Sequence, residues 1–204
     1  MMRALRSAIG LLALAITPGF AFAQGGITPL LTGPVALPMG DIELRGHITI
    51  EDVIDLFGVY RQGIGPGFDF GLRLGFTDFA GGGLHLGGDL RYEIPSGDLE
   101  LDLALAGGLQ VSFVEFANLI SVPFGISLGT QVGSPETPVL LLGFPFLDVV
   151  RVDPDIRDAQ TDLEFGVELG GEIGLTERLL ASAALVIASH DNDNVSLTLG
   201  LIYR

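Results

Sequence analysis

The 204-residue sequence contains no cysteine, no tryptophan and no lysine. Without cysteine, the protein has no disulfide framework, no thiolate metal site and no cysteine nucleophile. Beyond the N-terminal region it also lacks any apolar run of about 20 residues, the length of a membrane-spanning helix. The fold must therefore be held together by other means.

Basic residues are scarce as well. The sequence has 10 arginines against 25 acidic residues, a net charge of −15. Arg3 and Arg6 precede an apolar stretch that ends in Ala21-Phe22-Ala23, which is typical of a secretory signal peptide cleaved after Ala23. The mature chain then carries 8 arginines against the same 25 acidic residues, a net charge of −17. Such a charge repels phosphate backbones, so we expect no nucleic-acid partner.

Apolar and polar residues alternate along much of the chain. Residues 162–175, DLEFGVELGGEIGL, carry large apolar side chains on one parity and acidic residues or glycine on the other. Successive side chains of a strand point to opposite faces, so the pattern predicts a strand with one apolar and one acidic face. Strands of soluble domains usually have about 5 to 6 residues, whereas a tilted strand needs roughly 9 to 11 to cross a bilayer. The length favours a membrane-crossing strand.

Similar alternation along the rest of the chain, interrupted by turn signals, predicts ten strands. The predicted ranges are 41–50, 53–62, 68–77, 83–93, 99–114, 119–133, 138–149, 161–175, 179–190 and 195–204. Merging or losing one pair would leave eight. Residues 138–147 are apolar on both parities and the alternation is blurred at 179–189, so the sequence does not assign the facing of residues 138–149 and 179–190.

The polar parity indicates which face is inside. It consists largely of glycine, alanine and serine with carboxylates and a few arginines, a set that suits the confined interior of a closed sheet. In lipid, a sheet satisfies all its backbone groups only when it closes. We therefore predict an all-β fold, a single closed antiparallel transmembrane β-barrel of about ten strands, eight being the alternative count. A soluble periplasmic barrel is the alternative fold.

The predicted organisation has three parts: a signal peptide over 1–23, an irregular N-terminal leader over 24–40, and the transmembrane β-barrel over 41–204. The leader is rich in proline and glycine and has no periodicity. If both termini lie in the periplasm, the periplasmic turns are short, and the longest connection, residues 150–160, faces outward.

With these features, most of residues 41–204 resembles the small bacterial outer-membrane β-barrel proteins. The final stretch, VSLTLGLIYR, is similar to the C-terminal signal that those proteins present to the barrel-assembly machinery, with Leu199, Leu201 and Tyr203 as candidate signal residues. It departs from that signal by ending on Arg204 rather than on an aromatic residue. The resemblance implies an outer-membrane location, with outer-membrane lipids and the assembly machinery as partners.

The parity also predicts a set of charged residues that face the lumen. They are Asp69, Arg73, Asp89, Arg91, Glu100, Asp102, Asp162, Glu164, Glu168 and Glu172. Because rings of carboxylates favour cations, one hypothesis is a narrow, cation-biased pore for small polar solutes. The alternative is a structural or interaction barrel with a plugged lumen, since ten strands lie nearer to filled eight-stranded barrels than to open porins.

A lipid-modifying outer-membrane enzyme is a third alternative, which the sequence does not favour. The lipid A deacylases carry a His-x-Ser-Asn element, whereas His190 is followed at the second position by Asn192, with no serine in its place. We therefore expect no catalytic residues and no cofactor. Residues 190–194 lack the spacing of a calcium loop, and the acidic residues of 153–158 lie among Arg151 and Arg157, so both segments are interpreted as polar loops and no metal site is expected.

Overall fold

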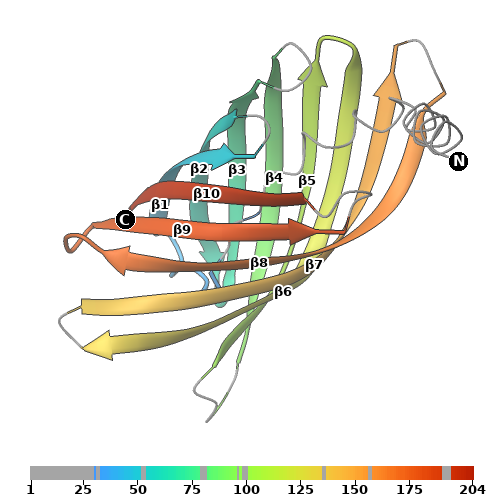
Figure 1. Cartoon of the computed structure of the whole chain (residues 1–204). Helices are drawn as coiled ribbons and strands as arrows, with labels where there is room; N and C mark the ends of the chain where they lie inside the picture. Colours follow the sequence, from blue (N-terminus) through green and yellow to red (C-terminus); the bar gives the residue numbers. More distant parts are fainter. Residues whose placement is uncertain are drawn as a thin grey trace, which may run out of the picture.

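The computed structural model describes residue 30 and residues 33–51, 54–78, 82–95, 97, 101–134, 137–155, 158–189 and 194–204. These residues form ten antiparallel strands that close into one barrel (Figure 1). The strands follow chain order around the barrel, and β1 pairs with β10 to close it. The predicted all-β fold and antiparallel closure are confirmed, with ten strands rather than eight. The predicted signal peptide lies outside the described residues.

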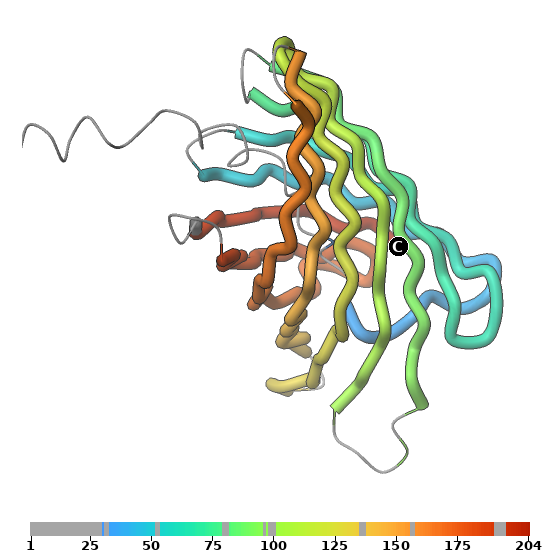
Figure 2. Tube along the Cα trace, turned by 90° about the vertical axis from the view of Figure 1, so that its right-hand side faces the viewer, coloured from blue at the N-terminus to red at the C-terminus, as the bar shows by residue number. Residues whose placement is uncertain are grey.

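The ten strands differ in length. They are β1 (Ile42–Ile50), β2 (Ile54–Gly65), β3 (Phe68–Thr77), β4 (Gly83–Ile94), β5 (Asp102–Val114), β6 (Ala117–Ser134), β7 (Thr137–Pro154), β8 (Gln160–Gly174), β9 (Leu179–Ala188) and β10 (Asn194–Tyr203). The longest, β6 and β7, have 18 residues each, twice the nine of β1. Figure 2 shows the long green-to-orange strands extending past the shorter blue and red ones. Within the described ranges, the structure contains no helix that is long and apolar enough to cross a membrane.

Two strands run three or more residues beyond their predicted ends. β2 continues to Gly65 through a bulge at Gly63 and Gly65, and the turn to β3 is made with Gly67 at a φ of 70°. β7 continues to Pro154, so the prediction that residues 150–160 form one long connection is wrong for its first five residues. The physical reason is packing, because Val150 and Val152 pack against Ala117 and Leu119 of β6 on the inner face.

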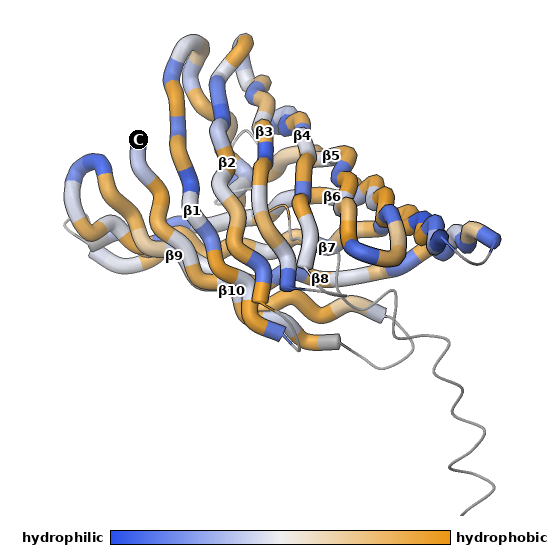
Figure 3. The backbone as a smooth tube through the Cα atoms, turned by 90° about the horizontal axis from the view of Figure 1, so that it is seen from above, coloured by the Kyte–Doolittle hydropathy of each residue, from blue (hydrophilic) through white to orange (hydrophobic). Residues whose placement is uncertain are grey.

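The large apolar side chains face outward. On β3, Leu72, Leu74 and Phe76 are 55%, 54% and 63% exposed, whereas Asp69 and Arg73 are 0% and 3% exposed. Figure 3 shows the same alternation of hydrophobic and hydrophilic positions along the strands. A soluble barrel would have the opposite facing, with charges outside. The outward apolar face instead matches the lipid-facing surface of a membrane barrel.

This facing predicts that a charge placed on the outer surface will destabilise the barrel according to its depth. Leu74→Arg, near the middle of β3, should lower the free energy of unfolding in lipid vesicles by about 2–4 kcal/mol. Leu175→Arg, on an exposed residue just past β8, is the matched control and should cost about 0–1 kcal/mol. Urea unfolding measures the stability of both variants. Far-UV circular dichroism follows it, because the chain has no tryptophan whose fluorescence could report unfolding. Equal losses would contradict the assigned facing.

Candidate functional site in the barrel lumen

The lumen is lined by buried charged side chains from most of the strands. Among the described residues, seven buried carboxylates face four buried guanidinium groups. The carboxylates belong to Glu43, Asp69, Asp89, Asp148, Glu164, Glu168 and Glu172, and the guanidinium groups to Arg45, Arg61, Arg73 and Arg91. The wall therefore holds more acids than bases.

Four of these side chains form one cluster on β2, β3 and β4, which we call the central ion network: Arg61, Asp69, Asp89 and Arg91. Arg61 Nη1 donates to Asp69 Oδ1 at 2.6 Å, and its Nη2 contacts Asp89. Arg91 Nε donates to Asp69 Oδ2 at 3.0 Å. Gly71 leaves room for this packing, because a Cβ there would lie 2.6 Å from Asp89 Oδ2. Asp69 is thus held by two arginines.

A second cluster lies where the barrel closes, and we call it the seam ring: Glu43, Arg45, Glu172 and Arg204. Glu43 accepts hydrogen bonds from Arg45 Nε and Arg204 Nε, both at 2.5 Å. Glu172 lies 3.2 Å from Arg45 Nη1 and from Arg204 Nη2. Charges alternate around the ring, which connects β1, β8 and the residue after β10.

The described part of the predicted leader, Leu30 and residues 33–40, enters the barrel, and we call it the lumen segment. Its described residues form no strand, and it is held through its main chain. Arg73 Nη2 donates to the carbonyl of Leu30 at 3.0 Å, and Arg91 Nη1 donates to the carbonyl of Gly33 at 2.5 Å. The amides of Ala36 and Leu37 donate to Glu93 and Asp69, both at 2.9 Å. The segment is therefore part of the lumen, which the sequence did not indicate.

Side chains of the lumen segment pack into openings in the wall. Leu30 is 3% exposed and lies in a cluster with Ala106, Phe144, Phe146 and Val186. Pro34 is fully buried beside Gly129, where a Cβ would lie 2.6 Å from Pro34 Cγ. A Cβ on Gly63 would lie 2.0 Å from the carbonyl oxygen of Pro38. Glycines thus provide the space that the segment occupies.

The structure places most of the predicted lumen residues inside. Seven are buried: Asp69, Arg73, Asp89, Arg91, Glu164, Glu168 and Glu172. Asp102 is half-buried, Asp162 is exposed near the start of β8, and Glu100 lies outside the described residues. The fold brings Asp69, Asp89 and Arg91 together and puts Glu172 in the seam ring. The candidate assembly residues Leu199, Leu201 and Tyr203 are exposed on the outer face of β10.

Several lumen residues were missed by the parity argument. Arg61 lies on the inner face of β2 together with the buried apolar residues Phe57 and Val59. Because the inner positions of β2 are partly apolar, the sequence of this strand shows no clear polar face. His85 is hydrogen-bonded to Ser112 at 2.8 Å, directly across the β4–β5 pair. The signal that could have found this bond was the register of the predicted hairpin, in which the two residues stand opposite each other.

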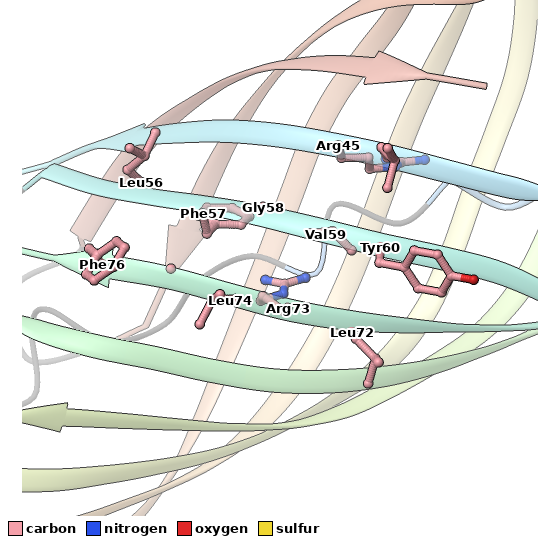
Figure 4. A pocket seen from close by; sticks show the side chains of 12 residues that line it. Arg45, Leu56, Phe57, Gly58, Val59, Tyr60, Leu72, Arg73, Leu74 and Phe76 are labelled. Carbon is pink, nitrogen blue, oxygen red and sulfur yellow. The ribbon is translucent and has the colours of Figure 1, made fainter.

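A pocket of about 580 Å³ lies on β1, β2 and β3 (Figure 4). Gly58 leaves a gap among the exposed side chains of Leu56, Leu72, Leu74 and Phe76, which line the pocket on the outer face. Most of the lining is apolar and faces lipid, but Arg45 and Arg73, whose buried side chains belong to the lumen, also line the pocket.

Together, the closed sheet, the outward apolar surface and the charged interior define a transmembrane β-barrel. No protein-family model matches the sequence, and a search of curated proteins found no match. Among solved structures, the chain is similar to a bacterial polysaccharide outer membrane secretin, with 13% identity over 74% of this chain and 56% of the secretin, at a TM-score of 0.50. The chain thus spans little more than half of that protein.

Further structures align less well. The KdgM porin has 6% identity over 79% of this chain and 98% of its own, at a TM-score of 0.44. LpxR from Salmonella typhimurium has 9% identity over 79% and 99%, at a TM-score of 0.45. At such identities the likeness shows the fold alone. Both TM-scores lie below 0.5, so nothing further about this chain is inferred from these two structures. The predicted resemblance to small outer-membrane β-barrels holds at the level of the closed antiparallel barrel, without a family-specific signature.

Proposed function

We propose that this protein is an outer-membrane β-barrel whose lumen is closed by its own lumen segment, so that it acts as a structural or interaction barrel rather than as an open pore. The observation that carries the proposal is the placement of the segment. Four hydrogen bonds tie its main chain to Arg73, Arg91, Glu93 and Asp69. Leu30 adds apolar contact on the far side of the lumen.

The burial of the wall charges supports the same proposal. Arg61, Asp69 and Asp148 are 1%, 0% and 0% exposed. A water-filled channel would leave the charges of its wall in contact with solvent. A ten-stranded barrel is also close in size to the barrels whose interior is filled by side chains.

The proposal predicts that the intact protein will show no steady conductance in planar bilayers. A variant that lacks residues 24–37 should conduct, because the deletion removes most of the lumen segment and leaves every strand unchanged. Single-channel recordings of both proteins, each shown by circular dichroism to be folded, measure the difference. Steady conductance of the intact protein, or a closed deletion variant, would contradict the proposal.

A second candidate function is the narrow, cation-biased pore, which the surplus of carboxylates in the wall favours. Such a pore requires that the lumen segment move aside. The deletion variant should then pass K⁺ in preference to Cl⁻, because seven buried carboxylates face four guanidinium groups among the described residues. The reversal potential in a KCl gradient measures the preference. Glu168→Gln should reduce it, and an anion preference would contradict this candidate.

Two kinds of partner fit the outer surface. The exposed apolar side chains support contact with outer-membrane lipids. Leu199, Leu201 and Tyr203 stand exposed on β10, where the barrel-assembly machinery could bind them. We propose both as partners and expect no catalytic activity.

A further inference from the structure

The lumen recognises the lumen segment chiefly through main-chain groups. Arg73 and Arg91 donate to carbonyl oxygens of the segment, whereas Glu93 and Asp69 accept from its amides. Main-chain groups are common to all polypeptides. Contacts of this kind therefore suit a polypeptide ligand and place few demands on its sequence.

The recognising side chains are held in place by the barrel itself. Asp69 is fixed by Arg61 and Arg91, and Arg91 is fixed in turn by Asp69. The guanidinium carbon of Arg73 lies 5.1 Å from the ring centroid of Phe57. Because these contacts do not involve the segment, the site exists without its occupant. Such preorganisation lowers the cost of binding.

The shape of the site sets the few sequence requirements. Leu30 occupies the apolar pocket of Phe144, Phe146 and Val186. Pro34 fits against Gly129, whose hydrogen leaves the space for the proline ring. The segment is attached to β1 at Gly40, which has a φ of 89° and donates its amide to the carbonyl of Gly63. That turn directs the chain into the lumen.

We propose that the lumen is a binding site for a proline-containing polypeptide segment, occupied in this structure by the lumen segment, Leu30 and residues 33–40 of the same chain, and able to take that segment from solution once it is vacated. This inference rests on the proposed closed lumen and goes beyond it, because a closed lumen alone does not require a site that can be refilled. The ligand class is a polypeptide with a leucine and a proline four residues apart.

The first test is a steric exchange in the full chain. Since the protein has no cysteine, Leu37→Cys, at a buried position, provides a single probe for a membrane-impermeant maleimide. In Gly129→Ala the new Cβ falls 2.6 Å from Pro34 Cγ and 2.9 Å from Cδ. The Gly129→Ala substitution should expel the lumen segment. Maleimide labelling of the cysteine at position 37 should then become about tenfold faster, which is the change in an equilibrium constant that the overpacking of one methyl group can produce.

The compensating variant makes this test specific. Pro34→Ala removes the two proline atoms nearest the new Cβ and leaves only the Leu141 carbonyl oxygen, 3.1 Å away within the wall itself. Labelling of the Pro34→Ala/Gly129→Ala protein should therefore return to the slow rate of Pro34→Ala alone. Gly46→Ala is the control, because its Cβ meets no atom within 4 Å, and it should leave the rate unchanged. Unchanged labelling in Gly129→Ala, or failure of Pro34→Ala to restore protection, would overturn the inference.

The second test asks whether the vacated site binds in trans. Leu30→Asp places a carboxylate in the apolar pocket and should release the segment in the full chain, as the probe at position 37 reports. A fluorescein-labelled peptide of residues 24–41 should then bind saturably to this variant in fluorescence anisotropy, and not to the occupied wild type. Adding Gly129→Ala should abolish binding of this peptide and permit binding of its Pro34→Ala version.

The outcomes separate the two proposals. A wild-type protein that conducts steadily would defeat the closed lumen. A wild type that is closed, with a Leu30→Asp variant that releases its segment but binds no peptide, would defeat the inference alone. Retained protection of position 37 in Leu30→Asp would also overturn the inference, since the apolar pocket would then not hold the segment.

Discussion

Replacing Asp69 with asparagine is expected to lower the free energy of unfolding by about 3–5 kcal/mol, the cost of removing one partner from a buried ion pair. Asp69 is fully buried and faces both Arg61 and Arg91. Asparagine keeps the size of the side chain but removes the charge. Arg61 would then keep its contact with Asp89, whereas Arg91 would lose its ion pair with Asp69. Urea unfolding in lipid vesicles, followed by far-UV circular dichroism, measures the loss.

Two matched variants test this account. Asp162→Asn removes the same charge at an exposed position of β8 and should change stability by no more than about 0.5 kcal/mol. Asp69 also accepts the amide of Leu37, so Asp69→Asn should increase maleimide labelling of a cysteine at position 37. If Asp69→Asn cost no more than Asp162→Asn, the central ion network would not stabilise the barrel.

The strands could be predicted from the sequence because lipid imposes a simple pattern on them. Phe68 to Phe76 alternate with Asp69, Arg73 and glycines, since one parity meets hydrocarbon and the other a crowded interior. The ends of β3 and the beginning of β4 lie at the predicted residues. The ends of β2 and β7 do not, because a bulge at Gly63 and inner-face packing of Val150 extend these strands.

The lumen segment could not be predicted, and its presence explains where the parity argument failed. The alternation fails at residues 138–147 and is blurred at residues 179–189 because Phe144, Phe146 and Val186 face inward to surround Leu30. This contact joins residues more than 100 positions apart in the sequence, and no local pattern records it. Nor did the proline-rich leader show that it enters the barrel, since its contacts there are made mainly by main-chain groups.

The seam ring gives the second prediction of large effect, because its two arginines have the same partners and different exposure. Arg45 and Arg204 each contact both Glu43 and Glu172, but their side chains are 3% and 43% exposed. Arg45→Met should lower the free energy of unfolding by about 3–5 kcal/mol, since it leaves two buried carboxylates with one half-exposed partner. Arg204→Met should cost only about 1 kcal/mol, because solvent screens its charge.

Arg45→Met and Arg204→Met are matched substitutions, because each removes a guanidinium group from the same two carboxylates. A difference between their losses of stability therefore reflects the burial of the arginine and not the type of substitution. Adding Glu43→Gln to Arg45→Met should recover part of the loss, since the added change removes one of the buried charges that Arg45 had balanced. The four proteins can be compared by urea unfolding in the same vesicles. Equal losses for the two arginine variants would mean that burial does not set the strength of the seam ring.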